Sequence, residues 1–519
     1  MRARLVGLAA VCAVAGTAAC GLVIGLEDHE AYPAEGGVLP EGSTPDGTMM
    51  TMDGGADGSD AKSEGGPLEA SAICEASMCG DACVDLQNDK NNCGTCNLAC
   101  DASACYRATC GGGAVTQLTA GTEHACALLQ AGDVWCWGAD DQAQILGPGD
   151  ASACPLGACR PAPARIPGLP NAVQISAGGA QTCAVDADGG VWCWGSNAGA
   201  GLGHAPGTDP TCTTAGGASV PCNAQPAAVV GLPGPATTVT SGQTSFACAL
   251  VSGSVYCWGD DTYAELGPAG NGSPSPTPQL VLTGAGGVAA GFAHACALVG
   301  GAPTCWGSNA SGELGHAPGG TDQSCPSATF CNPTPQAVGV TGVTSMHPGR
   351  YASCFETPGG VSCLGANDVG QLGLGTFNAT ANVTPAPVTI ESANLANVAS
   401  MDFGSRTACA LALATIYCWG DDETQQTNAT QDGLCTANVP CIIDGHAVGL
   451  VNVTEVRAST YATLARTDDG KVWAWGNNGA GQLGHPPGDA GDEGGCDPTA
   501  FPPSGTVCNS IPVAVQGLP

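Results

Sequence analysis

Two cysteines with a turn between them are the residues of this sequence best suited to chemistry. In HACALLQAGDVWCWG, residues 124–138, Cys126 and Cys136 flank an AGD turn, and the second lies between two tryptophans. Thiolates at this spacing could bind a metal ion, act as a redox pair or form a structural disulfide. The elements around them must decide between these three uses.

The same line recurs seven times, so the chain is built from repeats of roughly 56 residues. Its copies end at Gly138, Gly195, Gly259, Gly307, Gly365, Gly420 and Gly476. The seventh copy has Leu464 and Ala474 where the other six have cysteines. Because both cysteines disappear together, we interpret the pairs as disulfides across a hairpin, with Cα separations of about 4.5–5.5 Å. The predicted hairpin disulfides are Cys126–Cys136, Cys183–Cys193, Cys248–Cys257, Cys296–Cys305, Cys354–Cys363 and Cys409–Cys418.

A second set of cysteine pairs lies in long polar loops after five of the seven lines. These are Cys154/Cys159, Cys212/Cys222, Cys325/Cys331, Cys435/Cys441 and Cys496/Cys508. The third and fifth repeats lack both members. Repeat symmetry predicts that the loops emerge on one face. Two interpretations stay open: disulfides that pre-order a binding surface, or bulk that resists proteolysis.

Each line predicts two short strands around a tight turn, and therefore a small antiparallel sheet. In VWCWG the tryptophans point to one face of the strand and the cysteine to the other. All nine tryptophans lie in these lines, so we expect them in the core. The last of each line are Trp137, Trp194, Trp258, Trp306, Trp419 and Trp475.

Seven such sheets can bury their faces by closing a ring. The sequence ends at PVAVQGLP (512–519), and the first repeat begins at AVTQLTAG (114–121) without a preceding strand. We therefore expect one repeat to be split between the termini, with the C-terminal strand closing the ring beside the first repeat.

Two lines carry a family resemblance: AGFAHACALVGGAPTCWGSNASGELGH (290–316) and GRYASCFETPGGVSCLGANDVGQLGLG (349–375). They resemble regulator of chromosome condensation repeats, which read G-x-x-H-x-x-x-L, then G-x-V-x-x-W-G-x-N, then G-Q-L-G. The resemblance covers about residues 114–519. It implies an all-β fold, a seven-bladed β-propeller over 111–519, and no single activity.

The N-terminal part has three predicted segments. Residues 1–20 read as a lipoprotein-type signal peptide in which Cys20 is acylated; the alternative is ordinary cleavage near Ala19 and secretion. Residues 21–73 are acidic and read as a disordered tether. Residues 74–110 form a small cysteine-rich module of the kind found beside repeat domains in bacterial surface proteins. Its cysteines, which favour disulfides over zinc after an export signal, are Cys74, Cys79, Cys83, Cys93, Cys96, Cys100, Cys105 and Cys110.

Other candidate site residues have simpler interpretations. His204, His316 and His485 follow LG in three loops and are expected to pack there. His124 and His294 are expected to pack or hydrogen-bond within their blades. The pairs Asp140-Asp141, Asp260-Asp261 and Asp421-Asp422 alternate with Asn in other repeats, which suits Asx-turns and leaves calcium open. We assign no metal, no cofactor and no catalytic residue.

The net charge of −33 excludes charge-driven binding of nucleic acid or anionic lipid. Thirty-two cysteines favour an exported protein of the cell envelope or surface. We expect a non-enzymatic binding protein, a monomeric ring attached to the membrane only through a lipid anchor, with a protein or glycan ligand. Alternatives are an inhibitor of a secreted enzyme, a hydrolase or lyase and, remotely, the family's guanine-nucleotide exchange.

Overall fold

The computed structural model describes residues 113–147, 154–326, 329–390, 393–427, 433–435, 439–494 and 507–519, and four short strands before them. The chain divides into two units, Met1–Ser71 and Ala72–Pro519. The predicted signal peptide, Cys20 and the tether lie outside the described residues.

The predicted cysteine-rich module contributes only four short strands to the described part of the chain. Strand β1 (Ser77–Cys79) pairs with β2 (Ala82–Val84), and β3 (Cys105–Tyr106) pairs with β4 (Thr109–Cys110). The disulfides predicted for residues 74–110 fall outside the described side chains and stay a prediction, and their connectivity was left open by the sequence.

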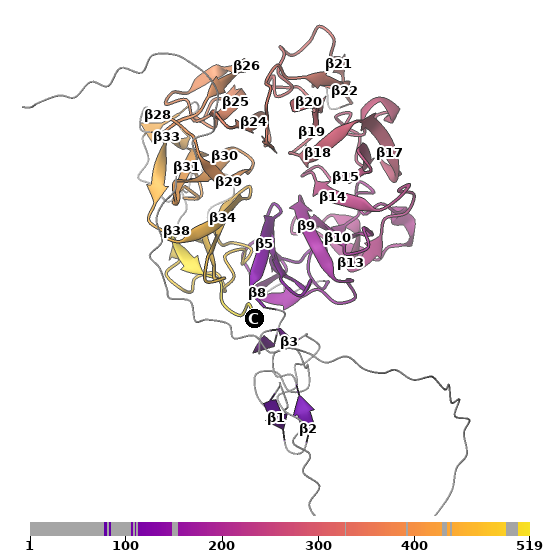
Figure 1. Ribbon diagram of the computed structural model, residues 1–519, viewed down its shortest axis with the longest axis vertical. Helices are drawn as coiled ribbons and strands as arrows, with labels where there is room; N and C mark the ends of the chain where they lie inside the picture. The colour runs from indigo at the N-terminus through magenta and orange to yellow at the C-terminus, as the bar shows by residue number, and fades with distance from the viewer. Residues whose placement is uncertain are drawn as a thin grey trace, which may run out of the picture. The chain divides into compact units, whose positions relative to one another are not determined.

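Seven antiparallel sheets surround a central axis and form a seven-bladed β-propeller (Figure 1). Blade one consists of β5 (Val115–Ala120), β6 (His124–Leu129), β7 (Val134–Ala139) and β8 (Cys159–Arg165). Blade two consists of β9 (Ala172–Gly178), β10 (Gln181–Asp186), β11 (Val191–Ser196), β12 (Thr211–Thr213) and β13 (Ser219–Ala228). Blade three consists of β14 (Ala236–Ser241), β15 (Phe246–Val251), β16 (Ser254–Gly259) and β17 (Ser275–Thr283).

The remaining four blades repeat this order. Blade four consists of β18 (Ala285–Ala290), β19 (His294–Val299), β20 (Ala302–Ser308), β21 (Gln323–Ser324) and β22 (Phe330–Ala337). Blade five consists of β23 (Ser345–Pro348), β24 (Ala352–Thr357), β25 (Gly360–Asn367) and β26 (Asn378–Pro387). Blade six consists of β29 (Val398–Phe403), β30 (Thr407–Ala412), β31 (Thr415–Asp421), β32 (Gly433–Leu434) and β33 (Pro440–Val448). Blade seven consists of β34 (Val453–Ala458), β35 (Ala462–Thr467), β36 (Val472–Asn477), β37 (Glu493–Gly494) and β38 (Val507–Ala514).

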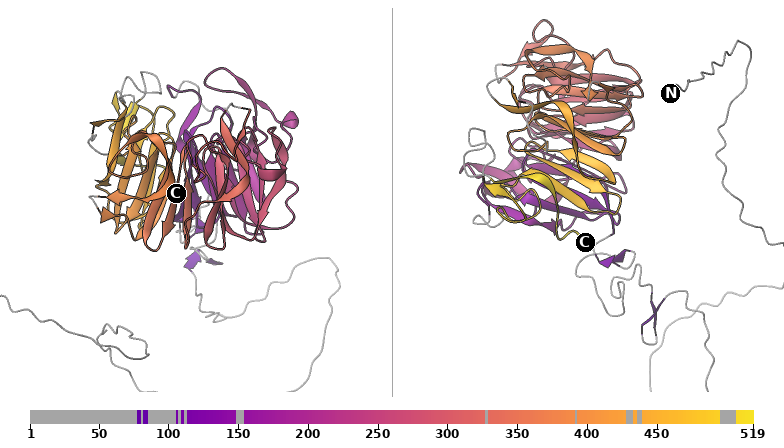
Figure 2. Two further views of the ribbon diagram at one scale, coloured as in Figure 1. Left: turned by 90° about the horizontal axis from the view of Figure 1, so that it is seen from above. Right: turned by 90° about the vertical axis from the view of Figure 1, so that its left-hand side faces the viewer.

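Few other elements are present in the described residues. A hairpin of β27 (Thr389–Ile390) and β28 (Ala393–Asn394) follows blade five, and η1 (Pro206–Thr208) and η2 (Gly267–Ala269) are single 3-10 turns. Within these residues, none of the helical segments has the length and apolar character that crossing a bilayer requires. Figure 2 shows the ring edge-on, with the blades following one another around it.

The predicted way of closing the ring is wrong. Strand β38 pairs with β36 as the outer strand of blade seven, and blade one already has four strands of its own. Among the described residues no blade is split between the termini, because β5 is the innermost strand of blade one and β38 is an outer strand of blade seven. Blades one and seven instead meet through packing of Leu118 against Leu464 and Val515, and through hydrogen bonds from the Leu118 amide to the Glu455 carboxylate at 3.2 Å.

The hydrophobic core lies in the seams, which are the packed interfaces between adjacent blades. Trp137 packs on the blade-seven side of its sheet, while Cys136 packs on the blade-two side. This is the alternation predicted from VWCWG. The six tryptophans that end the lines are fully buried. Trp135, Trp192 and Trp473 are only partly buried, contrary to expectation, because they lie nearer the hairpin turn at the edge of the seam.

Each line ends in glycine because the backbone conformation at that position favours a residue without a side chain. All seven have φ between 100° and 110°, a region that side chains with a Cβ rarely adopt. A Cβ at Gly138 would also lie 2.5 Å from the carbonyl oxygen of Glu123. The third strand bulges here, and the chain leaves the sheet toward the long loop.

Candidate binding face

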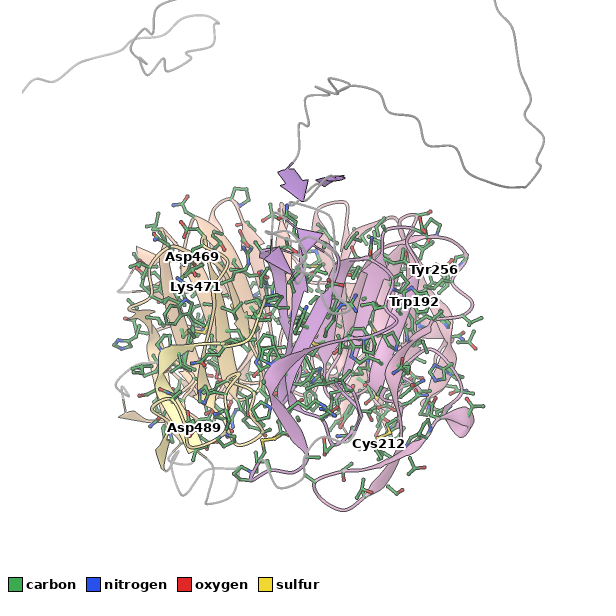
Figure 3. The ribbon with its side chains drawn as sticks, turned by 90° about the horizontal axis from the view of Figure 1, so that it is seen from below. Trp192, Cys212, Tyr256, Asp469, Lys471 and Asp489 are labelled. Carbon is green, nitrogen blue, oxygen red and sulfur yellow. A yellow bond between two sulfur atoms is a disulfide. The ribbon has the colours of Figure 1, made fainter. Side chains whose placement is uncertain are left out.

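The connections between the first and second strands of a blade emerge on the same side as those between the third and fourth. Backbone hydrogen bonds join the two connections, as from Ala139 N to Glu123 O and from Asn477 N to Tyr461 O, both 2.9 Å. In Figure 3, Cys212 and Asp489 of the long loops lie on one side, and Asp469 and Lys471 of a hairpin turn lie on the other. We call the first side the loop face.

The hairpin cysteines form structural disulfides inside the blades, away from the loop face. All six pairs are bonded between residues directly opposite each other on the second and third strands, as with Cys126 and Cys136. Their Cα atoms are 4.0–4.1 Å apart, closer than the predicted spacing. Every sulfur-bearing residue of this set is fully buried, so these pairs act as staples.

The loop cysteines are also bonded in the described part of the chain. The disulfides are Cys154–Cys159, Cys212–Cys222, Cys325–Cys331 and Cys435–Cys441. Cys508 is disulfide-bonded, and its predicted partner Cys496 lies outside the described residues. Within the described residues, a short fifth strand occurs in four of the blades that have loop cysteines, and blades three and five have neither feature.

The loop disulfides connect blades as well as loops. Cys212 and Cys222 of blade two pack against Ala143 of blade one. The bonded pair of blade four packs on Ala264, and that of blade six on Val369 of blade five. Three of the four described loop disulfides therefore rest on the preceding blade and tie the loop face together across those seams.

The inner connections form a hydrogen-bonded rim around the axis. Thr122 N donates to Gly179 O at 2.9 Å, and Phe292 N donates to Gly349 O at 2.9 Å. The Thr460 hydroxyl of blade seven reaches the Gln243 amide oxygen of blade three at 3.3 Å. The rim is therefore ordered before any ligand arrives, which lowers the entropy cost of binding.

The central channel contains a cavity of about 290 Å³ lined by the innermost strands of all seven blades. Its amide side chains are occupied by neighbouring blades. Gln117 exchanges two hydrogen bonds with the backbone of Ile175, and Gln174 does the same with Val239, at 2.9–3.0 Å. These side chains hold the blades together and are not available to a ligand.

The acidic residues after the blade glycines accept backbone hydrogen bonds. In every blade an Asp or Asn side chain accepts the amide of the residue five positions on, at 2.9–3.2 Å. This accounts for the Asp/Asn alternation. In blades three and six the acceptor is the second aspartate of the pair, Asp261 or Asp422. In blade one it is the first aspartate, Asp140, so the Asp140-Asp141 pair is offset by one residue from the other two pairs. Burial raises the pKa of Asp140 and of Asp422 to about 6.

Two of the three loop histidines bond to aspartates of their own loops, whereas His485 Nε2 has no hydrogen-bond partner among the described residues. His204 Nε2 lies 2.8 Å from Asp209, and His316 Nε2 lies 2.7 Å from Asp322. His485 Nε2 lies 3.6 Å from Asp492. The described residues contain no cluster of three or more His, Cys, Asp or Glu side chains placed to hold a metal ion.

The histidines His124 and His294 bond across seams and not within their blades, which corrects the prediction. His124 Nε2 contacts the hydroxyl of Thr182 in the next blade, and His294 Nε2 contacts that of Ser353, both at 2.8 Å. Burial lowers the pKa of His124 to about 4 and of His294 to about 3, so both are neutral. The sequence contained a signal for this, because each histidine is followed, one repeat later, by a residue with a hydroxyl group, Thr182 or Ser353.

A pocket of about 130 Å³ on the loop face was missed by sequence reasoning. Arg350 of blade five, Arg406 of blade six and Tyr461 of blade seven line it. The chain has only twelve lysines and arginines, and two of them lie in the rim loops of neighbouring blades. This clustering was the sequence signal that could have indicated the pocket. Burial, and then the Glu123 carboxylate, raise the pKa of Tyr461, so its hydroxyl stays protonated. Burial raises the pKa of Glu123 itself to about 7, with Asp141 adding to the effect.

Comparison with known proteins identifies the repeats. Residues 115–144, 172–198 and 453–482 match one model of the regulator of chromosome condensation (RCC1) repeat, and residues 469–519 match another. Protein pim1 of Schizosaccharomyces pombe is 28% identical over 159 residues, which are 28% of this chain and 29% of that protein. The chain therefore spans under a third of the length of that relative.

Solved structures share the fold. Prp20p from Saccharomyces cerevisiae, described with its binding to Gsp1p and histones, has a TM-score of 0.56 at 18% identity, covering 74% of this chain and 86% of its own. Human WBSCR16 has a TM-score of 0.54 at 18% identity, covering 74% of this chain and 94% of its own. Identity this low shows a common fold alone.

Proposed function

Because the chain carries RCC1 repeats on a seven-bladed propeller, we propose that it is a non-enzymatic binding protein whose loop face takes up a macromolecular partner. The observation that carries this proposal is the rigidity of that face. Its rim loops are hydrogen-bonded to one another, and its long loops are clamped by disulfides onto adjacent blades. A surface ordered in advance loses little entropy on binding.

We propose a protein as the partner. Prp20p, which shares the fold, is described as binding Gsp1p and histones, so this architecture can recognise proteins. The strong negative charge of this chain disfavours polyanionic partners such as nucleic acid. Inhibition of a secreted enzyme would be one form of such binding.

We propose that this binding takes place outside the cytosol, on a chain tethered through Cys20. Ten disulfides among the described residues support an oxidising compartment. Guanine-nucleotide exchange is disfavoured by the same argument, because the small GTPases it would serve are cytosolic. Labelling with a fatty-acid analogue, with and without Cys20→Ala, tests the anchor.

Two buried acids of the loop face, Glu265 and Glu313, have structural roles. Glu265 accepts hydrogen bonds from Tyr263 N and the Thr244 hydroxyl, and Glu313 accepts them from Ser308, Ala310 and Ser311. Each carboxyl is thus committed to holding a turn.

The test is affinity capture with the oxidised full chain against envelope extract and spent medium, read by mass spectrometry. Thr213→Arg places a large charge on an exposed position of a braced loop. Ala187→Arg makes the same one-unit change of charge at an exposed residue of a hairpin turn on the opposite face. We expect a captured protein to be lost with the first variant and kept with the second. Equal capture by both variants, or no capture by a folded and oxidised chain, would reject the proposal.

A further inference from the structure

The pocket between the rim loops of blades five, six and seven contains an arginine that forms no ion pair within the described residues. Seven basic side chains lie in the described residues, and six of them form ion pairs with aspartate or glutamate. Arg350 is the exception: within that part of the chain its guanidinium has no ion pair and no hydrogen bond. Its Nε is shielded from solvent, so its terminal nitrogens are the atoms that a ligand would meet.

Arg350 is held in place despite having no polar partner. Its Cζ lies 4.5 Å from the ring centroid of Phe292 and 4.9 Å from that of Tyr351. Both distances lie within the range of cation–π attraction, so the two rings hold the planar guanidinium in place. The backbone amide of Arg350 also donates to Ser405 O at 3.2 Å, which fixes the rim loop itself. The charge is therefore positioned in advance.

Two further donors face the same pocket. The Ser405 side chain is 5% exposed, and no described residue bonds its hydroxyl. The Tyr461 hydroxyl likewise has no hydrogen-bond partner among the described residues. Within the described residues, these two hydroxyl groups and the terminal nitrogens of Arg350 have no hydrogen-bond partner, so an acceptor that enters the pocket meets three unpaired donors.

The other charges of the pocket restrict what that acceptor is. Arg406 is already paired, at 2.8 Å with Asp368 and 3.6 Å with Asp421. Asp421 and Glu423 also line the pocket, which would repel a dianion such as phosphate. A single carboxylate suits one free guanidinium, whose fork matches its two oxygens. The net charge of −33 further disfavours a polyanionic carrier, such as an acidic polysaccharide.

We propose that Arg350, Ser405 and Tyr461 form a subsite for one carboxylate side chain of a protein partner. This rests on the proposed function and specifies where on the loop face the partner is anchored. Arg350 supplies the charge, and the two hydroxyl groups donate to the remaining lone pairs of the carboxylate.

The probe is the peptide N-acetyl-Gly-Asp-Gly-amide, compared with its Asn counterpart, added to the oxidised full chain. Binding is followed through the guanidinium ¹⁵N NMR signals of Arg350, which are assigned by their loss in Arg350→Gln. We expect saturable shifts with the Asp peptide and at least tenfold weaker binding of the Asn peptide. Ser405→Ala should weaken Asp-peptide binding several-fold. Arg165→Gln, which removes a paired arginine elsewhere, should leave it unchanged.

Several outcomes would overturn the subsite. These are equal response to the two peptides, no response to either, or tighter binding of inorganic phosphate or glucuronate than of the Asp peptide. A partner captured equally well by wild type and Arg350→Gln, yet lost with Thr213→Arg, would reject the subsite and leave the binding face standing. Capture that no loop-face variant changes would reject the proposed function itself.

Discussion

The seam between blades four and five and the seam between blades six and seven each contain a buried backbone carbonyl, of Glu313 and of Gln426 respectively. Different side chains donate hydrogen bonds to these two carbonyls. In the six–seven seam, Trp475 Nε1 and the Thr463 hydroxyl both donate to the carbonyl of Gln426, at 2.8 and 2.9 Å. In the four–five seam, Leu364 replaces the tryptophan, and the Ser353 hydroxyl alone donates to the carbonyl of Glu313 at 2.9 Å.

The difference shows that the donor is retained while the residue that supplies it changes. The buried carbonyl needs a partner, and an unpaired one would cost about 1–3 kcal/mol. His294 completes the substitution, because it bonds the same Ser353 hydroxyl from the preceding blade. A repeat can therefore lose its most prominent residue without losing its seam.

The largest expected effect comes from removing the tryptophan where the seam depends on it. Trp475→Leu should lower the free energy of unfolding by about 3 kcal/mol, because a fully buried ring leaves a cavity. Chemical denaturation measures this. The matched control is Trp135→Leu at a partly buried position, with an expected loss below about 1 kcal/mol. Equal losses would show that burial does not set the contribution of these tryptophans.

The second prediction exchanges the hairpin pairs of blades six and seven. Cys409→Leu with Cys418→Ala gives blade six the pair of blade seven and should lower stability by about 2–3 kcal/mol, since it removes a closed loop from the unfolded state. Leu464→Cys with Ala474→Cys should raise stability by a similar amount, because these residues are directly opposite each other. Denaturation with and without reductant compares them. A blade-six variant as stable as the oxidised wild type would contradict the staple role.

The third prediction tests the shared hydroxyl. Ser353→Ala leaves the Glu313 carbonyl and His294 Nε2 without partners and should lower stability by about 2 kcal/mol. Thr463→Ala should cost below about 1 kcal/mol, because Trp475 still bonds the Gln426 carbonyl. Ser353→Thr keeps the hydroxyl and should be close to wild type. Equal losses for the two alanine variants would remove the distinction between the seams.

The smallest effect concerns pH. Burial raises the pKa of the Glu313 side chain above its usual value. The residue at the same position of the six–seven seam is Gln426, which does not titrate. With a raised folded-state pKa, the contribution of Glu313 to stability is complete below the normal glutamate pKa and is lost as pH rises through the raised one. Glu313→Gln should therefore match wild type at acidic pH and exceed its stability at neutral pH. A difference in denaturation midpoint that does not change with pH would contradict this.

Comparison of equivalent positions in the seven repeats predicted most of the fold, because a change in one repeat shows which residues depend on each other in the rest. Cysteines that vanish in pairs, as at Leu464 and Ala474, indicated bonded neighbours without any homologue. The alternation of tryptophan and cysteine in VWCWG indicated two buried faces, and therefore seams. The error in ring closure arose because the period of a repeat does not fix where along the chain a blade begins and ends. The pairing of β38 with β36 places the C-terminal strand in blade seven.

The candidate site was less accessible to sequence reasoning. The loop disulfides were read correctly as pairs, but their packing against Ala143, Ala264 and Val369 joins residues of different repeats. The Arg350 pocket is assembled from three rim loops, with about a hundred residues between Arg350 and Tyr461. No local pattern records such a juxtaposition.

By itself the sequence determined the period, the number of blades, the paired cysteines and the buried faces of the strands, because these follow from local alternation and from comparison between repeats. The tertiary structure alone decided how the ring closes, which blade each histidine bonds, and which charge is left without a partner. Those outcomes depend on contacts between blades, where residues far apart in the chain compete for the same hydrogen-bond acceptors and the same counter-charges.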